Sequence, residues 1–123
     1  MQLQESGEMY LETILILSEK LEHMRSLDVA EYMGFSKPSV SRAVGLLKSA
    51  GYVLMAPTGY LTLTESGRSI AEKIYERHNT LAQFLMRIGV DEKTAIEDAC
   101  KVEHYISDVT FEKIKAFAQR NRT

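Results

Sequence analysis

The chain has 123 residues, of which 45% are hydrophobic and 26% charged, and its formal net charge is −2. This composition is typical of a globular protein and excludes a disordered or fibrous chain; no apolar run approaches the roughly 20 residues of a membrane span, and no signal peptide is expected. The single cysteine excludes an intrachain disulfide, so we expect a protein of the reducing cytoplasm that makes no membrane contact.

Apolar residues at helical spacing predict three helices between residues 9 and 50, the first of them fraying near residues 22–24. A residue type favoured at N-caps precedes each helix, and the predicted caps are Ser6 or Gly7, Ser26 and Ser36. The second and third helices are expected to stop at Gly34 and Gly51, because glycine accepts the left-handed conformation of a helix end. The predicted buried stripe of the third helix is Val40, Ala43, Val44, Leu46 and Leu47.

A β-hairpin is predicted after the third helix. Residues 52–56 and 60–64 have strand character, and Pro57, Thr58 and Gly59 form the turn between them. Three more helices follow, with predicted caps at Thr64, Asp91, and Ser107 or Asp108. This order, in which a helix-turn-helix precedes a hairpin, is typical of a winged helix-turn-helix. A mixed α+β domain that binds no DNA is the alternative.

The third helix carries the predicted DNA-reading surface. Residues 32–64 contain no acidic residue, and the basic residues in this window are Lys37, Arg42 and Lys48. A local positive charge is what DNA phosphates require of a protein whose total charge is negative. The predicted DNA contacts are Ser36, Lys37, Pro38, Ser39, Ser41 and Arg42. A solvated helix face is the alternative for these residues, and Lys48 is equally compatible with pairing to the helix dipole.

The tip of the hairpin, residues 57–60, is the wing of such a fold. A wing usually lies along the DNA backbone or in a minor groove. This tip contains neither arginine nor lysine. We therefore expect the wing to contribute only modestly to DNA binding.

Three side chains of metal-ligating type occur together late in the sequence. Cys100, Glu103 and His104 stand at i, i+3 and i+4 of the predicted fifth helix, so they share one face. Thiolate, carboxylate and imidazole are ligands of borderline divalent metals. Further candidates are Met9 and Glu12 on the first helix and His78 on the long helix. Taken singly, each of these residues also fits a structural role in the core or on the surface.

The sequence resembles the diphtheria-toxin-repressor family, which includes the iron-dependent repressors and the manganese transport regulator. The matching segments are spread over nearly the whole chain. They are residues 8–14, 35–41 and 63–67, Arg77-His78 with Leu81, Phe84 and Leu85, residues 98–104, and residues 107–108.

This resemblance implies a dimeric, metal-activated transcriptional repressor that is mainly α with a small β-hairpin. A winged helix-turn-helix DNA-binding domain is expected over residues 1–75 and a helical metal-binding and dimerisation domain over residues 76–123. The implied partners are double-stranded operator DNA, with metal uptake genes as the family's usual targets, and a second copy of the chain. The family's metal ligands carry over as Met9, Glu12, His78, Cys100, Glu103 and His104.

The ligand set combines two branches of the family. The two sulfur side chains are residue types of the iron branch, whereas Glu12 is the residue type of the manganese branch. Of the iron branch's ancillary site only His78 is kept, because Ala82 and Ile96 occupy the other two ligand positions. His78 then either assists the main site through Glu12 or has no metal role. The resemblance also indicates the short form, without the small β-barrel domain of longer members.

Sulfur ligands argue against Mn2+ and favour Fe2+, Co2+, Ni2+ or Zn2+. Because the choice in a cell follows availability as much as affinity, we expect Fe2+ as the cofactor, with Mn2+ second. Our hypothesis is that a metal held by side chains of both domains fixes the spacing of the two recognition helices in the dimer, which the DNA half-sites demand. The apolar residues expected to supply the dimer contact are Ile106, Phe111, Ile114 and Phe117.

Two other functions are compatible with parts of the sequence. A metal-independent winged-helix regulator that senses a small molecule is the main alternative. An enzyme with Cys100 as nucleophile and His104 as base is not expected, because nothing in the sequence supplies an oxyanion hole or a Gly-rich loop.

Overall fold

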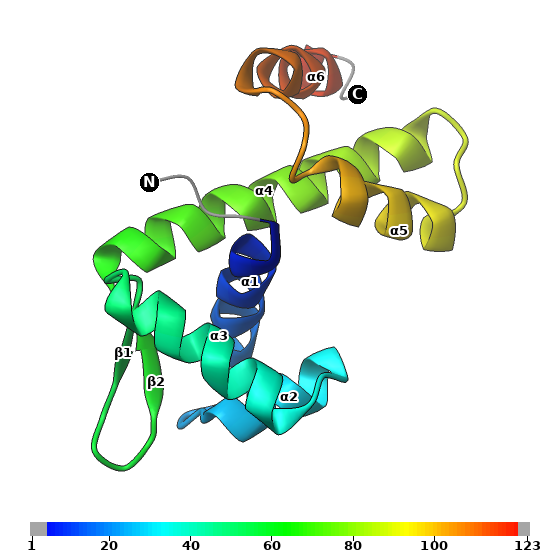
Figure 1. Cartoon of the computed structure of the whole chain (residues 1–123). Coiled ribbons are helices and arrows are strands. Elements are labelled where there is room, and N and C mark those ends of the chain that lie inside the picture. The colour runs from blue at the N-terminus through cyan, green and yellow to red at the C-terminus, as the bar shows by residue number, and fades with distance from the viewer. Residues whose placement is uncertain (1–4, 121–123) are drawn as a thin grey trace. The chain divides into compact units, whose positions relative to one another are not determined.

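The computed structural model describes residues 5–120 (Figure 1). In this part of the chain the elements are α1 (Glu5–Lys20), α2 (Ser26–Met33), α3 (Lys37–Ser49), β1 (Val53–Met55), β2 (Leu61–Leu63), α4 (Glu65–Arg87), α5 (Glu92–Val102) and α6 (Asp108–Arg120). The chain divides into two compact units, Met1–Glu72 and Lys73–Thr123. None of the described helices combines the length and the apolar character needed to cross a membrane.

The first unit is the predicted winged helix-turn-helix. The strands β1 and β2 pair antiparallel, with Val53 opposite Leu63 and Met55 opposite Leu61. Apolar side chains from α1, α2, α3, the hairpin and the start of α4 form one core. Its fully buried members include Leu11, Ile14, Val29, Val40, Val44 and Val53.

Most of the predicted helix ends are confirmed. Four predicted N-caps are observed, because in each the side-chain oxygen accepts the backbone N–H of the residue three positions later. They are Ser36, Thr64, Asp91 and Ser107. Both glycines predicted at helix ends, Gly34 and Gly51, have a positive φ. These signals are reliable because each cap is made between residues that are close in sequence.

Several details of the prediction are wrong. Both expected caps of the first helix, Ser6 and Gly7, lie inside α1, which ends at Lys20. Ser26 is the first residue of α2; the cap is Arg25, whose N–H donates to Asp28 Oδ2 at 2.8 Å. The Asp28 N–H, which a serine side chain at the cap would accept, donates instead to Arg25 O at 3.0 Å.

Three further predictions of packing or extent are also wrong. Leu46 is 68% exposed, since it lies outside the face of α3 that contacts the core. Both strands of the hairpin are shorter than expected, at Val53–Met55 and Leu61–Leu63. The fifth helix ends at Val102, before Glu103 and His104.

The start of α4 lies directly against the backbone that enters β1. Thr64 Oγ1 donates to Gly51 O at 2.7 Å, and Thr64 N–H donates to Tyr52 O at 3.1 Å. A Cβ atom at Gly67 would lie 2.0 Å from Tyr52 O. Only glycine therefore fits at this point, because any side chain would meet a backbone carbonyl that cannot move aside freely.

Gly67→Ala should destabilise the protein by about 3 kcal/mol, since either the hairpin or α4 must shift. Gly45→Ala is the matched control, because it is exposed in α3 and a Cβ there meets nothing within 4 Å. The control should stabilise the protein by about 0.5–1 kcal/mol through helix propensity. Urea unfolding at one protomer concentration measures both changes, and equal effects would contradict the close approach.

The second unit has a smaller core made by α4, α5 and α6. Its buried members are Leu81, Ala82, Ala99 and Phe111, with Ile106 and Ile114 packed against them. Phe111 was expected at the dimer contact, but it is buried within the subunit. Phe117, in contrast, is 49% exposed, and its ring meets Phe84 edge-on with centroids 6.3 Å apart.

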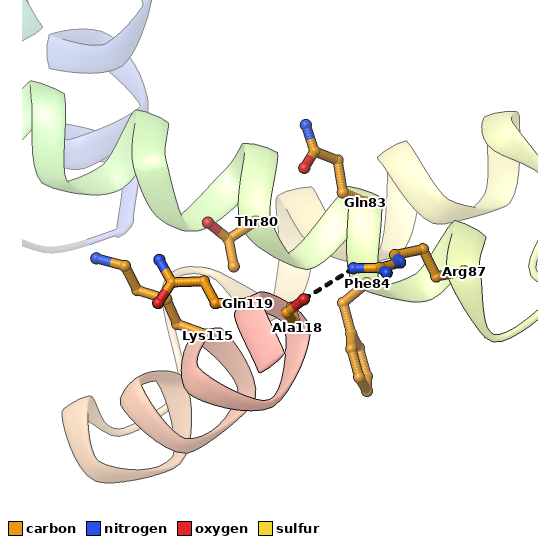
Figure 2. Close-up of a pocket in the computed structure, with 7 residues that line it drawn as sticks. All are labelled: Thr80, Gln83, Phe84, Arg87, Lys115, Ala118 and Gln119. Carbon is orange, nitrogen blue, oxygen red and sulfur yellow. Dashed lines mark hydrogen bonds between the residues drawn. The ribbon is translucent and has the colours of Figure 1, made fainter. Parts of the chain in front are cut away.

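Polar contacts complete this unit around the core. Figure 2 shows Arg87 of α4 reaching α6, where its Nη1 donates to Ala118 O at 2.9 Å. This bond satisfies one of the carbonyls that the end of α6 leaves open. Lys115 Nζ lies 2.6 Å from Glu76 Oε1, and this contact raises the pKa of Lys115. The Thr94 backbone N–H lowers the pKa of Asp91, the cap of α5.

The Asp91 cap makes stability depend on pH. Its pKa is lower in the folded chain than the usual 3.8, so its stabilising contribution is present above that value and is lost as the pH falls through the folded pKa. Asp91→Ala should therefore lower the melting temperature at about pH 6, and this difference should shrink towards pH 3. Asp98→Ala, exposed in the same helix, controls for the lost charge. A pH-independent difference would contradict the cap.

Candidate metal centre

Three side chains of metal-ligating type meet in the second unit. One ligand atom from each of His78, Cys100 and Glu103 can be chosen so that all three lie within 4.8 Å of one another. His78 Nδ1 is 3.0 Å from Glu103 Oε2. Ligands held about 2.1 Å from one ion lie roughly 3–4 Å apart, so this cluster is close to the dimensions of a metal site.

The end of α5 gives Cys100 and Glu103 a common face although the helix stops at Val102. Glu103 keeps helical angles, with φ −57° and ψ −27°, and its N–H donates to Ala99 O at 3.0 Å. The helical spacing predicted for the two side chains therefore continues one residue past the regular helix. Cys100 is partly exposed, whereas Glu103 is fully buried.

His104 lies in the turn that follows, and its side chain is also fully buried. Its Nε2 atom is 3.2 Å from Glu103 Oε1. The structure thus places one imidazole at each oxygen of the Glu103 carboxylate, His78 at Oε2 and His104 at Oε1.

The donors in this cluster fit a divalent cation. Within residues 5–120, Glu103 Oε1 is buried without an aligned hydrogen-bond donor, despite its proximity to His104. A buried carboxylate is costly unless its charge is compensated. A cation would compensate that charge, and carboxylate, imidazole and thiolate are its ordinary ligands.

Arg77 fixes the chain segment that carries this carboxylate, a role that sequence reasoning missed. The residue is 6% exposed, and its Nη1 donates to Ile106 O at 3.0 Å and to Glu103 O at 3.4 Å. Its Nη2 pairs with Asp108, and its guanidinium lies 5.2 Å from the Phe111 ring centroid. The available signal was the position of Arg77 on the apolar stripe of α4, three residues after Ile74 and four before Leu81.

Removing the buried guanidinium should be costly. Arg77→Met should destabilise the protein by about 2–4 kcal/mol, because carbonyls and a carboxylate lose a charged donor. Lys73→Met is the control, since Lys73 pairs with the same Asp108 at 3.4 Å but lies at the surface. The control should change stability by less than about 0.5 kcal/mol. Denaturant unfolding at fixed protomer concentration measures the free energy of unfolding of both variants. Equal losses of stability would mean that the buried hydrogen bonds of Arg77 stabilise the protein no more than a surface ion pair.

The two predicted ligands on α1 belong to the first unit. Met9 is half-buried, and Glu12 is 9% exposed. They lie one turn apart on α1. Their part in a metal site stays a prediction.

The predicted DNA-contact residues form an exposed surface at the start of α3. Ser36, Lys37, Pro38, Ser39, Ser41 and Arg42 are all exposed. Ser36 caps the helix and its hydroxyl donates to Ser39 Oγ at 2.8 Å. Pro38 lies in the first turn, where its missing N–H costs nothing. The arrangement can present two cations and several hydroxyls to DNA without a nearby carboxylate on the helix.

The second unit exposes apolar surface at the end of α4 and on α6. Phe84, Arg87, Ile88, Phe117 and Ala118 line a cavity of about 280 Å³. A smaller pocket beside it, of about 70 Å³, is the one drawn in Figure 2. Exposed apolar surface of this kind is typical of a subunit contact.

Comparison with known proteins finds two matching families, one for each part of the chain. The family described as "Iron dependent repressor, N-terminal DNA binding domain" matches residues 2–61. The family described as "Iron dependent repressor, metal binding and dimerisation domain" matches residues 64–123.

Two curated relatives cover most of the chain. An uncharacterised HTH-type transcriptional regulator of Methanocaldococcus jannaschii is 37% identical over 118 residues, which are 94% of either chain. The transcriptional regulator MntR of Salmonella typhimurium is 33% identical over 114 residues, 93% of this chain and 73% of that protein.

Solved structures show the same fold. The manganese regulator SloR has a TM-score of 0.82 and 32% identity over 92% of this chain. A manganese-dependent transcriptional repressor in complex with manganese has a TM-score of 0.84 and 29% identity, again over 92% of this chain. The chain spans about half the length of these two proteins, 53% and 52% respectively.

The two family matches and the curated relatives define a metal-dependent, DNA-binding transcriptional regulator with a dimerisation domain, which is a class of DNA-binding regulators and not of enzymes. The chain belongs to the diphtheria-toxin-repressor family, whose members include the iron-dependent repressors and the MntR regulators.

Proposed function

We propose that this chain represses transcription when Fe2+ or Mn2+ binds at the cluster formed by His78, Cys100, Glu103 and His104. The observation that supports this most directly is the fully buried Glu103 carboxylate, which has an imidazole at each oxygen and belongs to the Cys100 cluster. Met9 and Glu12 on α1 are proposed as further ligands, on the strength of the family resemblance. When bound, the metal would supply the positive charge that compensates this carboxylate, and DNA binding is proposed to require the occupied site.

Fe2+ is the proposed first choice and Mn2+ the second. The Cys100 thiolate is a soft ligand, which suits iron better than manganese. The two solved relatives described as manganese regulators, and the carboxylate at Glu12, favour manganese instead. A direct comparison of the two ions in the melting experiment below tests this order.

The remaining parts of the function follow the two family matches. Residues 1–75 are proposed to bind operator DNA through the exposed start of α3, with Ser36, Lys37, Pro38, Ser39, Ser41 and Arg42 as the contacts. Residues 76–123 are proposed to hold the metal and to form the dimer through the exposed apolar surface at α4 and α6. The site of action is proposed to be the cytoplasm, where operator DNA is accessible.

Metal binding should be visible as added stability. Thermal melting is measured under anaerobic, reducing conditions with Fe2+, Mn2+, Zn2+ or Mg2+. An ion that binds and is present at 100 times its dissociation constant should raise the free energy of unfolding by about 2.7 kcal/mol. Cys100→Ala and Glu103→Gln should reduce this increase, because each removes a ligand while nearly preserving volume. Glu97→Ala, exposed on the same helix, is the control and should respond to metal like the wild type.

The same variants should lose metal-dependent DNA binding. His104→Ala and Glu103→Gln should no longer bind an operator fragment more tightly when the favoured ion is added, whereas Glu97→Ala should keep this response. A chelator should weaken the wild-type complex. If wild-type DNA binding were unchanged by chelation, a regulator that senses a small molecule would replace this proposal. A normal metal response in either ligand variant would contradict the ligand assignment.

A further inference from the structure

The wing receives a positive charge from a segment outside the hairpin. Its own tip, residues 57–60, has no basic side chain. The loop between α1 and α2 lies against it, because Leu61 N–H donates to Met24 O at 2.7 Å. The Met24 side chain is buried in the core, whereas its neighbours His23 and Arg25 are exposed. This alternation is that of an extended segment, and it turns both basic side chains towards the wing.

Both of these side chains rest on Tyr60, the last residue of the wing tip. The His23 and Tyr60 rings are stacked, with centroids 4.5 Å apart and planes at 13°. Arg25 Cζ lies 4.7 Å from the Tyr60 ring centroid. Arg25 also reaches the turn itself, since a Cβ atom on Gly59 would lie 3.9 Å from its Nε. The guanidinium is therefore held over the wing at a defined place.

The charge of Arg25 is available to a ligand. Among residues 5–120, no carboxylate forms an ion pair with its guanidinium. Asp28 accepts from the backbone N–H of Arg25 and not from the side chain. Stacking on an aromatic ring uses the face of a guanidinium and leaves its in-plane N–H donors for a bidentate partner such as a phosphate.

We propose that Arg25, positioned by Tyr60, is the cationic contact of the wing with the DNA phosphate backbone. The inference rests on the DNA binding described above, and it adds a residue outside both the recognition helix and the hairpin. Charge complementarity supports it, because residues 32–64, which include α3 and the whole wing, contain no carboxylate. Because the wing tip itself has no basic side chain, the positive charge at this place depends on Arg25.

Salt dependence of binding tests this contact without knowledge of the operator. The probe is a fluorescein-labelled duplex of about 30 base pairs and mixed sequence, titrated with the full chain and Mn2+ between about 50 and 200 mM KCl, because non-specific affinity comes from phosphate contacts. Each phosphate contact makes the slope of log K against log salt about 0.9 more negative. A dimer carries two copies of Arg25, so Arg25→Ala should make this slope less steep by about two. Arg25→Lys should retain most of it.

The control is Arg120→Ala, which removes the same charge from α6 and should leave the slope unchanged. An unchanged slope for Arg25→Ala beside a binding wild type would overturn this inference alone. A wild type that does not bind the duplex at all would overturn the proposed DNA binding as well. Melting curves of all variants identify losses that come from unfolding, in which case Arg25→Gln replaces the alanine variant.

The role of Tyr60 is tested by rescue and by a double-mutant cycle. Tyr60→Phe keeps the ring and should bind like the wild type. Tyr60→Leu should weaken binding in the wild-type background and have little further effect when Arg25 is already alanine, because the two residues act as a unit. Equal effects of Tyr60→Leu in both backgrounds would show that Tyr60 does not act through Arg25.

Discussion

A carboxylate without access to water is the constraint around which the second unit is organised. Glu103 is fully buried, and the desolvation of its charge costs several kcal/mol unless nearby groups compensate it. His78 from α4 and His104 from the following turn each approach one of its oxygens. Arg77 binds the backbone carbonyl of the same residue. Polar contacts thus set the position of the turn that follows α5, and a cation at the cluster would add further contacts to it.

The two units differ in how much apolar packing supports them. The first has a core that draws on α1, α2, α3 and the hairpin, whereas the core cluster of the second unit is smaller, with Leu81, Ala82, Ala99 and Phe111 as its buried members. A small core supplies little stability, so such a unit depends on polar contacts, ligands and association with another subunit. The exposure of Ile88 and Phe117 fits this view, because a homodimer can bury them. The family match for metal binding and dimerisation covers this second unit.

DNA recognition in the first unit relies on charge that is local rather than global. The chain carries a net charge of −2, yet α3 and the hairpin are free of carboxylates in the sequence. Basic side chains reach this surface from two places, the start of α3 and the loop before α2. Such a distribution attracts phosphates at one face while the rest of the protein stays acidic.

The sequence by itself determined the order of the elements, the winged helix-turn-helix and most of the helix ends. Those features depend on contacts between close neighbours, such as Ser36 with Ser39 and Asp91 with Thr94. It also placed Cys100 and Glu103 on one face, because helical geometry relates residues three apart. The resemblance to a known family pointed to His78, although its part in the cluster was left open.

Only the tertiary structure decided which distant residues meet. It brought His78 to Glu103 across 25 positions, and it placed Arg77 on the carbonyls of Glu103 and Ile106. It also exposed Leu46, buried Phe111 and set Arg25 over Tyr60. None of these contacts follows from local spacing, because each depends on how whole helices and loops pack, and packing is fixed by the apolar surface of the complete unit.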